Sequence, residues 1–85
     1  MNSDISEKSA EDAVLAAFGQ VLGIAETDRD VPFAALGGDS MRAVRVLSRL
    51  WRELGVELPV HALGKSTTAA ELAATVRQHA QGQST

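Results

Sequence analysis

The chain contains no cysteine, so neither disulfide bonds nor thiolate metal sites can supplement its core. It also lacks any apolar run that approaches the roughly 20 residues of a membrane-spanning helix. Residues 1–9 are polar, with no apolar stretch behind a basic start, which argues against a secretory signal. A chain of 85 residues forms one small domain that buries only about 60% of its unfolded surface. We therefore expect a cytoplasmic, monomeric domain that is stabilised by a packed core alone.

Strand alternation is missing as well, because no stretch alternates apolar and polar residues over more than a few positions. Three segments show helical periodicity instead. The first covers residues 10–22, with Ser9 and Asp12 as a near capping box and Gly23 as a plausible stop. Its apolar side chains share one face, which consists of Val14, Leu15, Phe18, Val21 and Leu22.

Two further helices are expected over residues 41–54 and 69–80. The first of them ends at Gly55, and the second begins at a capping box formed by Thr68 and Glu71. A short helical turn over residues 60–63 is expected after Pro59. The apolar stripe of residues 41–54, predicted to face the core, consists of Val44, Val46, Leu47, Leu50, Trp51 and Leu54. The last helix presents one apolar face that consists of Leu72, Ala73, Val76 and Ala80.

Residues 24–39 form a long loop, and loops of this length inside a small domain are usually functional or disordered. Its apolar side chains Val31, Phe33 and Leu36 are predicted to anchor it to the helices, with Phe33 and Leu36 buried. The fold class is therefore all-α, with three main helices, one short helix and a long loop between the first two. Residues 1–8 and 81–85 are expected to be flexible segments that flank a domain of residues 9–80.

Charge is unevenly distributed along the chain, with a net −6 on residues 1–39 and a net +3 on residues 40–85. Four arginines step along the second helix at spacings of 3, 4 and 3 residues and share about one quarter of its circumference. They are Arg42, Arg45, Arg49 and Arg52. A solvated basic face accounts for this stripe as well as a binding surface does. The negative total charge and the lack of interleaved aromatic residues argue against binding of nucleic acid.

The run Gly37-Gly38-Asp39-Ser40 leads from the loop directly into the second helix. In one interpretation the motif is merely a helix start, with Asp39 or Ser40 as the N-cap residue. A nucleophilic serine is disfavoured, because Arg42 stands where the nucleophile-elbow pattern requires Gly. A serine at a helix N-terminus is also a good acceptor for a phosphate-linked group, since unpaired N–H groups and the helix dipole favour an anion there. The residues alone do not name that group.

The order of these features resembles that of the peptidyl carrier proteins, or thiolation domains, of nonribosomal peptide synthesis. In that family an aromatic residue and a leucine precede Gly-Gly-His/Asp-Ser and an apolar residue, which here are Phe33, Leu36, Gly37, Gly38, Asp39, Ser40 and Met41. Downstream the family has a Leu-Pro-Val-like segment and a Thr cap with Leu four residues later, here Leu58-Pro59-Val60, Thr68 and Leu72. Thr67 departs from the proline that the family usually has. The resemblance covers about residues 9–80.

The resemblance implies that Ser40, within the motif Gly37, Gly38 and Asp39, carries 4′-phosphopantetheine derived from coenzyme A. The arm would hold an aminoacyl, aryl or peptidyl group as a thioester, and the chain itself would not be an enzyme. Implied partners are a phosphopantetheinyl transferase, an adenylation enzyme, and a condensation, thioesterase or tailoring enzyme. A polyketide-type acyl carrier and a helical protein-interaction module, with Ser40 only a cap, remain as alternatives. Both a freestanding carrier and a domain of a larger synthetase would look like this chain.

The same resemblance suggests where partner enzymes dock. We expect Met41, Arg42 and Arg45 to form the docking surface, because they lie beside Ser40 on the second helix. Val60, His61 and Leu63 of the short helix would complete it. A basic helix beside the attachment serine should repel enzymes that recognise acidic fatty-acid carriers, because like charges at an interface are unfavourable.

Overall fold

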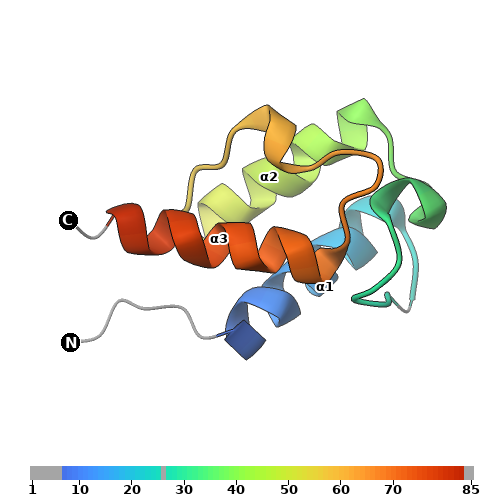
Figure 1. The fold of residues 1–85 in the computed structure, drawn as a ribbon. Coiled ribbons are helices and arrows are strands. Elements are labelled where there is room, and N and C mark those ends of the chain that lie inside the picture. Colours follow the sequence, from blue (N-terminus) through green and yellow to red (C-terminus); the bar gives the residue numbers. More distant parts are fainter. Residues whose placement is uncertain (1–6, 26, 84–85) are drawn as a thin grey trace.

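The computed structural model describes residues 7–25 and 27–83, and within these residues the chain is helical with no strand. The elements in order are α1 (Glu7–Leu22), the short 3₁₀ helix η1 (Phe33–Leu36), α2 (Ser40–Leu54), the 3₁₀ helix η2 (Val60–Ala62) and α3 (Ala69–Gln83). Figure 1 shows η1, the start of α2 and the loop into α3 together at one end of the molecule. In the described part of the chain, no helix is both long and apolar enough to cross a membrane. The all-α prediction is confirmed.

Helix α1 packs against both α2 and α3, and η2 packs against α2. The apolar periodicity of α1 explains its place, since Val14 and Phe18 are completely buried while Leu22 packs at the margin of the core. The core is apolar throughout and contains Ala10, Val14, Ala17, Phe18, Phe33, Ala43, Val46, Leu47, Leu50, Val56, Leu58, Leu63, Ala69, Leu72, Ala73 and Val76.

Several predicted helix boundaries are confirmed by their backbone geometry. Helix α2 ends at Gly55, which has a φ of 71° and donates its N–H to the Trp51 carbonyl oxygen at 2.8 Å. Gly23 follows α1 with a φ of 70°, a left-handed conformation that glycine adopts without steric cost. Thr68 and Glu71 form the reciprocal capping box before α3, with N–H to oxygen distances of 3.0 and 3.1 Å.

Other boundaries differ from the sequence prediction. Helix α1 begins at Glu7, so Ser9 and Asp12 lie inside the helix and do not form its capping box. Helix α3 continues to Gln83, three residues into the segment expected to be a flexible tail. Residues 1–6 and 84–85, also expected to be flexible, lie outside the described residues. The turn after Pro59 ends at Ala62 and not at Leu63.

The placement of Trp51 in the core was wrong. Its side chain is 52% exposed, and Val44 on the same stripe is 47% exposed. Val46, Leu47 and Leu50 on the same arc are buried by the rest of the chain. The apolar arc of α2 is therefore wider than the surface that buries it.

The long loop is anchored as predicted, through Phe33. This ring is 2% exposed and packs on Phe18 with the ring centroids 5.0 Å apart. Leu36 and Val31 are only partly buried, so the predicted full burial of Leu36 was wrong. The loop also has backbone partners before α3, because the N–H groups of Phe33 and Ala34 donate to the carbonyl oxygens of Thr67 and Lys65, both at 2.9 Å.

Candidate attachment site

Ser40 is the first residue of α2, and Asp39 is the cap that precedes it. The Asp39 backbone is extended, with φ −142° and ψ −176°, and its Oδ1 accepts a hydrogen bond from the Arg42 N–H at 2.9 Å. Ser40 is exposed, and its hydroxyl forms no hydrogen bond with the rest of the described chain. The structure therefore assigns the capping role to Asp39 and contradicts the alternative in which Ser40 is only a cap.

Asp39 is held in its charged form. The backbone N–H of Arg42 is the main cause that lowers the pKa of its carboxyl group below the ordinary value of 3.8, and the Arg42 guanidinium group adds to the effect. The guanidinium Nη1 donates to Asp39 Oδ2 at 2.9 Å, which closes an exposed ion pair across the first turn of α2. The negative charge next to Ser40 is thus locally compensated.

Gly37 and Gly38 are required for different reasons. Gly37 has a φ of 95° and caps η1, with its N–H directed at the carbonyl oxygens of Ala34 and Phe33. Gly38 has no positive φ, but a Cβ atom there would lie 2.4 Å from Cδ2 and Cε2 of the buried Phe33 ring. The ring occupies the space that a side chain at residue 38 would need. The glycine pair therefore lets the loop anchor and the start of α2 approach each other.

A cavity of about 400 Å³ opens beside Ser40. Its walls come from η1, from the start of α2 and from the segment before α3, and they comprise Phe33, Ala34, Gly38, Asp39, Ser40, Ala43, Leu63, Gly64 and Lys65. The hydrogen bond between the Ala34 N–H and the Lys65 carbonyl oxygen ties two of these walls together. A mainly apolar cavity with one lysine at its margin thus adjoins the exposed hydroxyl.

The predicted docking residues only partly share one surface. Met41 is 74% exposed and Val60 is 68% exposed, and Arg42, Arg45 and His61 are exposed as well. The assignment of Leu63 to the docking surface was wrong, because this residue is only 5% exposed. It is the C-cap residue that follows η2 and faces the core, where it also lines the cavity beside Ser40, so it is not part of the exposed docking surface.

Comparison with known proteins identifies the family of this chain. The family model for the phosphopantetheine attachment site matches residues 12–76. The chain is 36% identical to a solved nonribosomal PCP domain, over 81% of this chain and 86% of that domain, with a TM-score of 0.68. This chain belongs to the peptidyl carrier domains. Members of the family carry 4′-phosphopantetheine and do not catalyse reactions themselves.

The chain is also similar to two further proteins. It is 38% identical to part of tyrocidine synthase 3 of Brevibacillus parabrevis, a match that covers 92% of this chain and 1% of that protein. It also resembles BlmI, a type-II acyl carrier protein from Streptomyces verticillus involved in bleomycin biosynthesis. That match has 25% identity, a TM-score of 0.76, and covers 93% of this chain and 90% of BlmI.

Ser40 and its motif were predicted from the sequence, but two features of the site were not. One is the role of Lys65, which lies 25 positions after Ser40 and reaches the cavity only through the pairing of two loops. The other is the contact between Gly38 and Phe33. Their spacing of five residues does not reveal the contact, because the intervening turn η1 brings the ring under the glycine.

Proposed function

We propose that Ser40 is the attachment residue for the phosphopantetheine arm and that the chain carries an aminoacyl, aryl or peptidyl group in nonribosomal peptide or hybrid biosynthesis. The observation that carries the proposal is the exposed Ser40 hydroxyl, which the fold does not use, at the start of α2. The neighbouring carboxylate performs the capping instead. A serine in this position is accessible to a modifying enzyme without loss of a structural hydrogen bond.

The residues around Ser40 fit a phosphate-linked group. The first turn of a helix offers backbone N–H groups and a partial positive charge to an anion. Among the described residues that line the cavity, only Asp39 carries a carboxylate, and this group is paired with Arg42. Lys65 lines the same cavity, and it forms no ion pair within the described residues. A phosphodiester on Ser40 would therefore meet the positive end of α2 and the ammonium group of Lys65, while Arg42 already compensates the charge of Asp39.

The arm itself would supply a terminal thiol that holds the acyl group as a thioester. The contribution of this chain is to present the arm and to shelter part of it. The apolar side chains of Phe33, Ala43 and Leu63 in the cavity wall suit the arm's carbon chain, while Lys65 suits its phosphate.

Carrier domains of this family work with separate catalytic domains. For this chain we propose a phosphopantetheinyl transferase, an adenylation enzyme, and a condensation, thioesterase or tailoring enzyme as partners. The proposed docking surface consists of Met41, Arg42, Arg45, Val60 and His61. Met41 is a flexible, exposed thioether beside Ser40 and can adapt to several partner pockets.

A loading assay tests the proposed function. The chain with phosphopantetheine attached is incubated with ATP and a panel of adenylation enzymes, each with its amino or aryl acid. The intact mass of the chain then shows whether the thioester has formed. We expect one enzyme or more to load the wild-type chain, and Met41→Ala to load more slowly without a large change in stability. Loading by a fatty-acyl or polyketide acyltransferase, with none by any adenylation enzyme, would contradict the proposed cargo class.

A further inference from the structure

Helix α2 carries two arginines whose charge is not compensated within the described residues. Arg42 pairs with Asp39 at 2.9 Å, and Arg49 pairs with Glu53 at 3.5 Å. Within residues 7–25 and 27–83, Arg45 and Arg52 form no such pair. The stripe that looks uniform in the sequence is therefore divided into two neutralised arginines and two that are available to an external anion.

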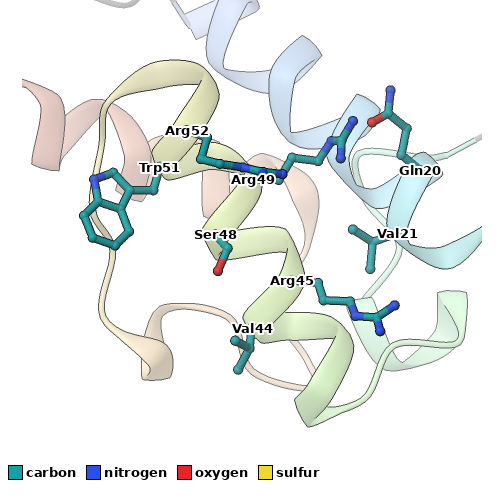
Figure 2. A pocket seen from close by; sticks show the side chains of 8 residues that line it. All are labelled: Gln20, Val21, Val44, Arg45, Ser48, Arg49, Trp51 and Arg52. Atoms are coloured by element: carbon teal, nitrogen blue, oxygen red, sulfur yellow. The ribbon is translucent and has the colours of Figure 1, made fainter.

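Each of these arginines follows an exposed apolar residue. Val44 precedes Arg45 and Trp51 precedes Arg52, so an apolar–basic pair repeats after seven residues, or about 10.5 Å along the helix axis. Figure 2 shows Val44 and Trp51 on one side of α2 and Arg45 on the other, where it points toward α1. The surface thus has an apolar edge and a basic edge that run parallel along two turns of α2.

A small residue lies between these edges. Ser48 is exposed and faces outward between Val44 and Trp51 in Figure 2. With Leu47 as the floor, these residues stand at positions i, i+3, i+4 and i+7, the four positions that form a hole for a side chain of a packed helix. A groove lies on each side of the row formed by Val44, Ser48 and Trp51. One, of about 620 Å³, reaches Gln20 and Val21 of α1, and the other, of about 160 Å³, reaches Leu58 and Val60.

We propose that this face, which we call the Trp51 surface and define as Val44, Arg45, Ser48, Trp51 and Arg52, binds an acidic amphipathic helix of a partner protein. An apolar side chain of that helix would enter the space above Ser48. Two carboxylates spaced seven residues apart would reach Arg45 and Arg52, because the pairs on both helices then repeat over the same distance.

The charge and the repeat together select this occupant. A basic partner would be repelled by Arg45 and Arg52, and a featureless anion would leave the exposed indole of Trp51 without a contact. The surface also continues past the residues proposed to dock the enzymes near Ser40, with only Arg45 in common. The proposal does not require modification of Ser40, so it is tested on the unmodified chain and on Ser40→Ala.

Trp51 is the only tryptophan of the chain and reports directly on the surface. The probe is a synthetic helical peptide with leucine and glutamate in heptad order, titrated into the full chain while Trp51 fluorescence is recorded. We expect a saturable shift of the emission to shorter wavelength, because the ring leaves water. Two control peptides, one with the same composition in scrambled order and one with lysine for glutamate, should bind at least about tenfold more weakly.

Matched variants distinguish binding at the Trp51 surface from a general effect of the net charge of the chain. Arg45→Glu with Arg52→Glu should weaken binding by about tenfold or more, because two attractive pairs become repulsive. Arg42→Glu with Lys65→Glu changes the net charge equally but acts at the Ser40 end, and it should bind the peptide nearly as the wild type does. Ser48→Gln, which fills the space between Val44 and Trp51 without a change in charge, should also weaken binding. Circular dichroism confirms that each variant is folded.

Several results would overturn the proposal. One is the absence of saturable binding up to millimolar peptide. Another is equal binding of the ordered and scrambled peptides, which would leave only attraction of negative charge. Equal losses in the two double variants would have the same meaning. Concentration-dependent self-association of the chain that buries Trp51, measured by sedimentation, would assign the surface to a second copy instead.

Discussion

Substitution of Gly38 by alanine tests how the loop is joined to the start of α2. The added Cβ atom would lie 2.4 Å from two carbons of the Phe33 ring and 2.6 Å from a third. These distances are far below van der Waals contact, so the ring or the backbone must move. The ring has little freedom, because it is 2% exposed and packs on Phe18. The clash therefore propagates into the core beneath the attachment site.

The expected cost follows from overpacking. Insertion of a methyl group into a well-packed site destabilises a protein by about 1–3 kcal/mol. Removal of the ring by Phe33→Ala should cost more, about 3–5 kcal/mol, because it leaves a cavity. For a domain whose total stability is about 5–15 kcal/mol, both effects are measurable by urea unfolding followed by circular dichroism.

Neighbouring glycines provide the controls. Gly64→Ala places its Cβ 3.7 Å from Thr67 Oγ1, an ordinary contact, and should change stability little. Gly37→Ala meets no atom within 4 Å but has a φ of 95°, so it should cost about 1–2 kcal/mol through backbone strain alone.

The double variant isolates the contact between residues 38 and 33. In a Phe33→Leu background, Gly38→Ala should lower the free energy of unfolding much less than it does in the wild type. Gly37→Ala should lower it by the same amount in both backgrounds. If the cost of Gly38→Ala is the same with Phe and with Leu at residue 33, or is only a few tenths of a kcal/mol, the ring does not set the requirement for glycine.

Two further predictions concern helix starts. The folded-state pKa of Asp39 is lowered, so its contribution to stability is complete above the ordinary pKa of 3.8 and is lost as the pH falls through the folded value. The stability difference between wild type and Asp39→Asn should shrink as the pH falls below about 4, and a difference independent of pH would contradict the capping ion pair. At the start of α3, Thr68→Ala should cost about 1 kcal/mol and Thr68→Ser much less, because serine keeps the capping oxygen. Equal losses in a urea titration would argue against the capping box.

The sequence predicted the helices well because their signals are local. Glycines ended α1 and α2 as expected, and the Thr68–Glu71 capping box marked the start of α3. Phe33 was recognised as an anchor because apolar residues in a polar loop need a partner. The helix ends and the capping box depend on residues within a few positions of one another, which a sequence displays directly. The burial of Phe33 could be predicted from its apolar character, but its partner Phe18 could not.

The errors concern contacts between distant segments. Periodicity placed Trp51 on the same arc as Leu47 and Leu50, but it cannot show how much of that arc the neighbouring helix covers. Leu63 was assigned to the surface because its helical turn was thought to include it. The pairing of Ala34 with Lys65, which builds the cavity, joins positions 31 residues apart and has no local signal.

The attachment of the arm to Ser40 is tested most directly by intact mass spectrometry. Wild-type chain, Ser40→Ala and Ser48→Ala are incubated with coenzyme A and a phosphopantetheinyl transferase of broad specificity. We expect wild type and Ser48→Ala to gain the mass of one phosphopantetheinyl group and Ser40→Ala to gain none while it keeps its helical content, because Asp39 and not Ser40 caps α2. Modification of Ser40→Ala, or no modification of the wild type by an active transferase, would contradict the assignment of Ser40.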